Sequence, residues 1–160
     1  MAANVMLIVE REFDFPQSQV FRAWTAPEEM ALWRGSPGWH VEPETVSSEL
    51  KLGGKHHHVK VRDDDPSVRV VTDAVFTEYF DPDVFVARQR ITGDPGIDPD
   101  VLMELRVEFT KYGRDGRGTL VRIVQGPYEP SRAEYHATGW ERELTRLQEF
   151  LSGHDGGAPR

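Results

Sequence analysis

The sequence predicts an α+β domain in which a curved antiparallel β-sheet is covered by one long C-terminal helix. Two short helical segments follow the first strand, and short alternating segments separated by turn residues fill the middle of the chain. The apolar spacing becomes that of a long helix only near the C-terminus. Because strands and helices are segregated along the chain, the class is α+β.

The N-terminal third predicts one strand followed by two short helices. Residues 4–15 alternate between apolar and polar side chains, which is typical of a strand. The apolar spacing within residues 18–24 predicts a short helix, and Pro27 marks the first turn of a second one. Gly35 ends this second helix, since glycine interrupts regular structure.

The middle of the chain predicts a run of strands joined by tight turns, which indicates an antiparallel sheet. A loop rich in proline and glycine, residues 93–99, interrupts this run. The segments expected as strands are 41–52, 55–62, 68–80, 84–91, 101–110 and 119–125.

The C-terminal helix is predicted to start at Ser131 as N-cap, with Glu134 three residues later. Apolar residues then recur at three- and four-residue spacing from Ala137 to Leu151, while the glutamates, Glu143 among them, lie mostly elsewhere. We expect a single domain over residues 1–152 and a flexible tail over residues 153–160.

Charge and composition exclude several classes of protein. The 160 residues carry 27 acidic and 19 basic side chains, a net charge of −8, which disfavours a nucleic-acid or anionic-membrane partner. The lack of cysteine excludes a disulfide scaffold and a thiol nucleophile. No signal peptide or spanning segment is readable, so we expect a cytoplasmic protein.

Motifs spread along the chain carry a family resemblance: Arg11–Pro16, Val20–Glu28, Leu32–Trp33, Leu50–Lys55, Glu78–Pro82, Gly118–Val121, His136–Trp140 and Leu144–Leu147. With these motifs in this order and spacing, the chain resembles the SRPBCC (START-like or Bet v 1-like) superfamily. It is most similar to the branch related to the C-terminal domain of the 90-kDa heat-shock-protein ATPase activator. The resemblance implies a helix-grip fold with an internal cavity, and it implies no shared reaction.

The cavity implied by this resemblance gives a set of expected ligand-contacting positions. Alternation along the strand, combined with the family pattern, places His56 and His58 inside and His57 outside. The whole expected set is Trp33, Trp39, His56, His58, Tyr79, Phe85, Gln89, Met103, Leu105, Val107, Ile123, Gln125, His136 and Trp140.

The two inward histidines have two interpretations. They replace aromatic side chains and form hydrogen bonds to a ligand or water, or they ligate zinc together with a third residue. The possible third ligands are Glu49, Glu104, Glu108, His40 and His136. We favour the first interpretation and expect no metal, cofactor or catalytic residue.

Three other pairs of side chains also have two possible interpretations each. Gln89 and Gln125 either reach water at strand ends or orient a polar group of a ligand. Trp33 and Trp39 either close the core or act as a gate hinged on the glycines between them. His136 and Trp140, four residues apart, either anchor the helix or line the cavity. The sequence leaves these alternatives open.

We expect the protein to bind a hydrophobic small molecule in the cavity between sheet and C-terminal helix. One alternative is a chaperone co-factor-like protein-interaction module, which the family resemblance implies. Another is a cyclase- or dehydratase-type enzyme that uses His56 and His58 as acid and base. A homodimer is compatible with the resemblance.

Overall fold

The structure, a computed structural model, describes residues 3–154. Its helical segments are α1 (Gln17–Thr25), α2 (Pro27–Trp33), the 3-10 turn η1 (Pro43–Thr45) and α3 (Pro130–His154). Its strands are β1 (Val5–Phe13), β2 (Trp39–Val41), β3 (Ser47–Ser48), β4 (Lys55–Arg62), β5 (Asp65–Phe80), β6 (Val84–Thr92), β7 (Met103–Tyr112) and β8 (Gly118–Tyr128).

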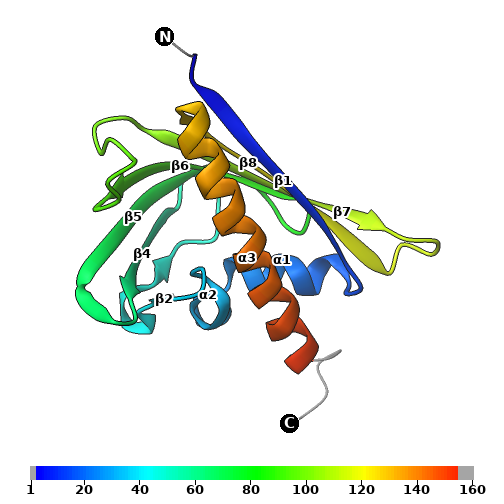
Figure 1. Ribbon diagram of the computed structural model, residues 1–160. Coiled ribbons are helices and arrows are strands. Elements are labelled where there is room, and N and C mark those ends of the chain that lie inside the picture. Colours follow the sequence, from blue (N-terminus) through cyan, green and yellow to red (C-terminus); the bar gives the residue numbers. More distant parts are fainter. Residues whose placement is uncertain (1–2, 155–160) are drawn as a thin grey trace.

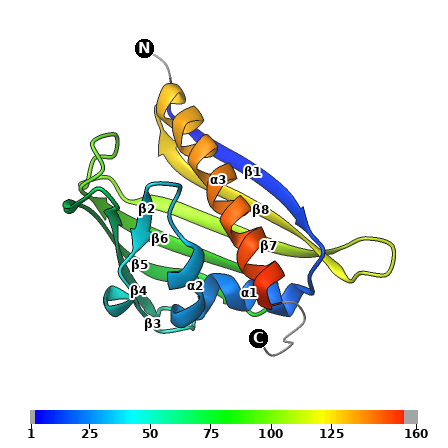
Figure 2. The ribbon, with the colours of Figure 1, turned by 60° about the horizontal axis from the view of Figure 1, so that its bottom comes forward.

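The strands form one antiparallel sheet in the order β1-β8-β7-β6-β5-β4-β2, with β3 paired to β4. The sheet curls around α3, which crosses its concave side (Figure 1). Turning the molecule shows α1 and α2 closing one end of the concave side, next to the lower half of α3 (Figure 2). The arrangement confirms the predicted α+β helix-grip fold.

The core lies between the concave face of the sheet and the helices. Alternate residues of β7 point into it, and Met103, Leu105, Val107 and Phe109 are buried. From α3, the apolar stripe buries Trp140, Leu144, Leu147 and Leu151 against the sheet. The apolar residues that alternate along the strands and those that recur at helical spacing along α3 therefore pack into one core, as the sequence predicts.

Two predicted boundaries are wrong for a physical reason. Residues 41–52 do not form one strand: Pro43 lacks an amide hydrogen for the ladder and instead begins η1, which separates β2 from β3. The long helix begins at Pro130 rather than after Ser131, because proline suits the first helical position.

The same helix passes through Gly153 and ends at His154, so the first two residues of the expected tail are helical. The remaining part of that tail, residues 155–160, lies outside the described residues. None of the helices within residues 3–154 is long and apolar enough to cross a membrane.

Candidate functional site

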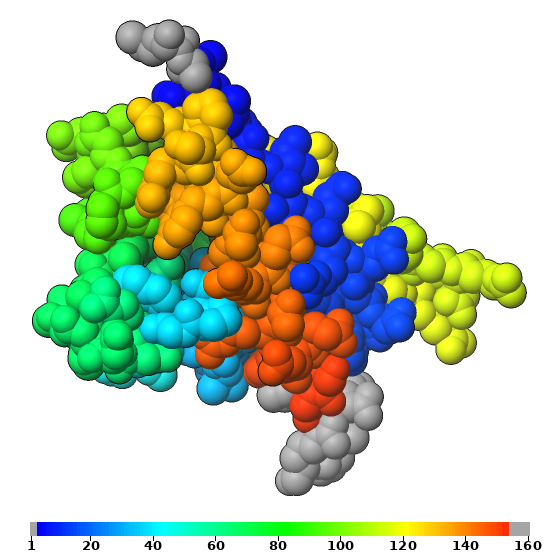
Figure 3. Space-filling model, viewed as in Figure 1, coloured from blue at the N-terminus to red at the C-terminus, as the bar shows by residue number. Residues whose placement is uncertain are grey.

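A small cavity lies between the concave face of the sheet and the end of the molecule that carries α1 and α2. Its free volume is about 30 Å³, which is room for a few water molecules at most. Its apolar lining includes Trp24, Met30, Phe76, Phe85 and Leu105. Its polar lining includes Arg34, Ser48, His56, His58 and Gln89. The space-filling view shows α3 and the segment around β2 in the centre of one face, with a small recess beside them (Figure 3).

Arg34 places a fixed positive charge at the wall of this cavity. Its guanidinium carbon lies 4.8 Å from the ring centroid of Trp140. The corresponding distances to Trp33 and Trp24 are 5.7 Å and 5.8 Å. Cations are attracted to the faces of aromatic rings, so the three indoles form a cage around this side chain. Trp24 and Trp140 also stack on each other, with centroids 5.6 Å apart.

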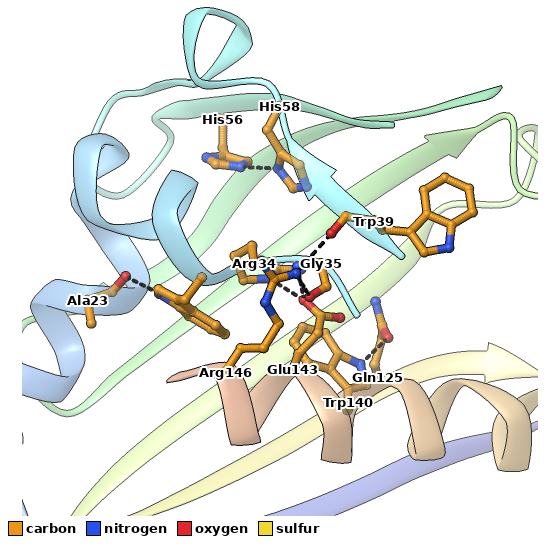
Figure 4. Close-up of polar contacts among 11 residues, drawn as sticks. Ala23, Arg34, Gly35, Trp39, His56, His58, Gln125, Trp140, Glu143 and Arg146 are labelled. Carbon is orange, nitrogen blue, oxygen red and sulfur yellow. Dashed lines mark hydrogen bonds and ion pairs between the residues drawn. The ribbon is translucent and has the colours of Figure 1, made fainter. Parts of the chain in front are cut away.

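A carboxylate from α3 neutralises the caged guanidinium. Arg34 Nε donates to Glu143 Oε1 over 2.9 Å, and the Gly35 amide donates to the same oxygen over 2.8 Å (Figure 4). Burial opposes the charge of Glu143 most strongly. Arg34, Lys60 and the Gly35 amide nevertheless outweigh burial and lower the pKa of this carboxyl below its ordinary value. The pair is therefore ionised inside the protein at neutral pH.

The segment between Trp33 and Trp39, for which core closure and a gate were the two interpretations, is anchored. Arg146 of α3 donates to the carbonyl oxygens of Gly35 and Trp39 over 2.7 Å and 2.9 Å. Trp33 is fully buried, and its indole nitrogen donates to the carbonyl oxygen of Ala23 over 2.8 Å. These contacts favour the core-closure interpretation of Trp33 over a mobile gate.

The two inward histidines form a hydrogen-bonded chain along β4. His56 Nε2 lies 2.8 Å from His58 Nδ1, and His56 Nδ1 lies 3.1 Å from Ser48 Oγ. Burial, aided by the charge of Arg34, lowers the pKa of His56 to about 4 and that of His58 well below its ordinary value. Both rings are neutral at pH 7. A ring of such low pKa is a weak base, so hydrogen bonding suits this pair better than acid–base catalysis.

Several donors at the cavity have no acceptor among the described residues. Trp24 is 4% exposed, yet its Nε1 atom has no hydrogen-bond partner there. Gln89 uses its oxygen to accept from Gln125, and its amide nitrogen donates to no described residue. Arg34 uses Nε for Glu143, and its terminal nitrogens donate to no described residue. A buried donor without an acceptor costs free energy. The cavity is therefore suited to a group that accepts hydrogen bonds.

Gln125 is the centre of a buried polar network. Its amide nitrogen donates to Gln89 Oε1 over 2.9 Å, and its own oxygen accepts from Tyr128 Oη and Trp140 Nε1, each over 2.9 Å. Gln89 and Gln125 are only 6% and 5% exposed. The interpretation that they reach water at strand ends is therefore wrong.

The expected ligand-contacting positions divide into two groups. His56, His58, Phe85, Gln89 and Leu105 line the cavity. The others lie outside its lining: Trp33, Trp39, Tyr79, Met103, Val107, Ile123, Gln125, His136 and Trp140. The cavity lies beneath α1 and α2 because Trp140, stacked on Trp24, fills the space expected between the sheet and α3.

His136 belongs to a separate cluster near the start of α3. Its ring stacks on Tyr128 with centroids 4.8 Å apart, and its Nε2 atom lies 3.6 Å from Asp94 Oδ2. Burial lowers the pKa of His136, although Asp94 opposes this shift. Arg132 also pairs with Asp94, at 3.3 Å. This cluster ties the loop after β6 to α3.

Four of the five residues considered as further metal ligands have other partners: His40, Glu49, Glu108 and His136. Within residues 3–154, no group of three or more His, Asp or Glu side chains is placed to hold a metal ion. His40 pairs with Asp63 at 2.5 Å. Glu49 accepts from the Lys55 amide over 2.9 Å. The contacts of His56 and His58 are thus explained by hydrogen bonds.

Eight residues of the cavity lining are outside the expected set: Trp24, Thr25, Met30, Arg34, Ser48, Ala74, Phe76 and Ala87. Glu143, which binds Arg34, is outside it as well. Glu143 had a readable signal, because it falls three residues after Trp140 and next to Leu144, on the apolar side of the helix. A carboxylate there requires a buried cation. Arg34, which directly follows the second short helix, is that cation, and no local sequence pattern links it to Glu143.

The curled antiparallel sheet around a C-terminal helix, with a small cavity of mixed polarity at one end, defines the class as a helix-grip protein of the SRPBCC superfamily. Residues 14–152 match the family described as "Activator of Hsp90 ATPase homolog 1-like protein". The match spans most of the chain, and the chain belongs to this family.

Solved structures show the same fold. Protein CV1439 from Chromobacterium violaceum is 16% identical, with a TM-score of 0.78 over 91% of this chain and 96% of that one. Protein NE0264 from Nitrosomonas europaea is 20% identical, with a TM-score of 0.75 over 98% and 99%. Protein SPO3351 from Silicibacter pomeroyi is 17% identical, with a TM-score of 0.75 over 92% and 97%. No curated protein matches the sequence.

Proposed function

We propose that the protein binds a compact small molecule, with an apolar body and a hydrogen-bond-accepting group, in the cavity beneath α1 and α2. The convergence of unused donors from Trp24, Arg34 and Gln89 in an otherwise mostly apolar cavity supports this proposal. Small-molecule sites commonly combine apolar walls with a few placed polar groups. A carboxylate or carbonyl oxygen is the group that these donors fit.

The free volume of about 30 Å³ has room for a few water molecules only, so the cavity is much smaller than the hydrophobic-ligand cavity expected from the sequence. A lipid or polyketide would need several hundred cubic ångströms, so we propose a smaller molecule than the family resemblance implies. Its binding requires that side chains around the cavity move apart. Met30 has a flexible side chain, and α2 and β3 are the shortest walls, with seven and two residues. Displacing these walls costs less than opening the sheet.

The other two functions have less support. An enzyme that uses His56 and His58 as acid and base would need imidazoles that titrate near the working pH, whereas burial keeps both pKa values low. The chaperone-interaction module rests on the description of the family, and no feature of the cavity supports it.

Calorimetry with a panel of benzoate, phenylacetate and short aliphatic carboxylates, beside the matching alcohols, tests the proposal. We expect carboxylates to bind and alcohols to bind at least tenfold more weakly. Ala87→Leu fills the cavity without removing a polar group, and we expect it to weaken binding at least tenfold. Val124→Leu, on the outer face of β8, is the matched control. Failure of the panel to bind, or equal binding by Ala87→Leu, would contradict the proposal.

A further inference from the structure

A groove larger than the internal cavity lies on the outer side of the same strands. Its volume is about 470 Å³, within the range of small-molecule sites. It is lined by residues of β3, β4, β5 and β6 together with Leu102, which directly precedes β7. The internal cavity and its ligand play no part in the inference that follows.

Strand register places basic side chains on both sides of this groove. Lys55 of β4 is paired with Val75 of β5, and Val75 is paired with Arg88 of β6. Residues paired across neighbouring strands share a face and lie about 5 Å apart, so Lys55 and Arg88 stand about 10 Å apart on either side of Val75. The next row on this face contains His57, Asp73 and Arg90 in the same order.

The charge of the groove is opposite to that of the whole chain. Lys55, Arg88 and Arg90 face a single lining carboxylate, Asp73, whereas the chain carries a net charge of −8. Glu104 of β7 is the cross-strand neighbour of Arg88 and lies outside the lining. Asp73 Oδ1 is already bound by His57 Nδ1 at 2.7 Å. Within residues 3–153, Lys55 and Arg88 form no ion pair. Their charges are therefore available to an anion.

The floor and rim of the groove are apolar. Val75 and Leu102 are 41% and 46% exposed. The methylene groups of Lys55 and the two arginines extend this apolar surface, because long basic side chains present apolar stems below their charged ends. Apolar contact surface flanked by unpaired cations is complementary to a molecule that has an apolar body and one negative charge.

We propose that the groove formed by Lys55, Val75, Arg88, Arg90 and Leu102 is a second ligand site, which binds a soluble organic anion with an apolar body, such as an aromatic carboxylate or sulfonate. The ligand must be negatively charged because Lys55 and Arg88 have no ion-pair partner, and its size is limited by the groove volume of about 470 Å³.

The probe for this test is 8-anilinonaphthalene-1-sulfonate, and its uncharged counterpart is N-phenyl-1-naphthylamine. Fluorescence titration measures affinity, and amide chemical shifts in two-dimensional NMR locate the probe. We expect the sulfonate to bind at least tenfold more tightly than the uncharged compound, with shifts concentrated in β4, β5 and β6. Lys55→Glu/Arg88→Glu should abolish this binding.

Two matched variants make the outcome decisive. Lys111→Glu/Arg142→Glu makes the same change in net charge at exposed positions away from the groove, and we expect normal binding. Ala87→Leu, which fills the internal cavity, should also leave the sulfonate titration unchanged. Equal loss in both charge variants, loss in Ala87→Leu, or equal affinity for the uncharged compound would overturn the proposal. Tight binding of an acidic peptide with no binding of the probe would overturn it too.

Discussion

The inner and outer faces of β4 place the same residue type in opposite environments. His56 and His58 point into the molecule, where burial keeps their rings neutral and each bonds to the other. His57, between them, points outward and pairs with Asp73 at 2.7 Å, with its side chain 38% exposed. Neighbours in sequence thus differ in burial and in partners, because alternation along the strand places them on opposite faces of the sheet.

The inner pair, Arg34 with Glu143, and the outer pair, His57 with Asp73, differ in the same way. Arg34 and Glu143 have side chains only 15% and 9% exposed, and an aromatic cage surrounds the cation. His57 and Asp73 are 38% and 60% exposed. Water can replace a lost partner at the outer pair and cannot do so at the inner one. The comparison teaches that position in the sheet decides what each polar contact contributes to stability.

The largest expected effect comes from breaking the inner pair. Arg34→Met leaves the Glu143 carboxylate buried without its cation, so we expect the free energy of unfolding to fall by about 3 to 5 kcal/mol. Urea denaturation followed by tryptophan fluorescence measures this change.

The double variant Arg34→Met/Glu143→Gln separates charge from packing in that experiment. It removes both charges while keeping side chains of similar volume, so it should recover more than half of the lost stability. A single variant that costs less than 1 kcal/mol, or a double variant as unstable as the single, would show that the pair does not behave as a buried one.

The fold was predictable from the sequence because its signals are local and repeated. Alternation along Met103 to Phe109 and helical spacing from Trp140 to Leu151 both survive in the structure. At Pro43 a proline changes the local geometry and divides the segment that was expected as one strand. Other strand ends, such as the start of β5 at Asp65 and of β7 at Met103, differ from the expected bounds by two or three residues. The family resemblance, and not the local pattern, predicted that the sheet is curved and wraps around the C-terminal helix.

The site was less predictable because its contacts join distant parts of the chain. Arg34 and Glu143 are 109 positions apart, and no local pattern pairs them. Alternation, with the family pattern, correctly placed His56 and His58 on one side of β4, but it could not show that they bond to each other. The depth of the cavity depends on how Trp24 and Trp140 stack, which is a property of the whole core.

A second prediction concerns pH and the inner histidines. Unfolded histidine binds a proton near pH 6.5, whereas native His56 resists protonation until about pH 4. Between these values the unfolded state binds more protons, so stability falls as pH decreases. For His56 alone the loss reaches about 3 kcal/mol once the pH is below 4, and His58 adds to it.

Urea midpoints measured from pH 7 to pH 5, above the range in which Glu143 titrates, check this prediction. His136 also has a lowered pKa and contributes to the same slope, so the informative quantity is the difference between variants. His56→Phe/His58→Phe should flatten the dependence. A slope that persists in the double variant would contradict the assignment.

The smallest expected effect is on the outer pair. His57→Gln and Asp73→Asn each remove one partner of an exposed contact, and water solvates the group that remains, so we expect each change to cost less than about 0.5 kcal/mol. Urea denaturation at pH 7 in low and high salt measures both variants and their double combination. A coupling energy above about 1 kcal/mol would mean that the outer face excludes water from this pair. The contrast between the two sides of β4 would then not follow from burial alone.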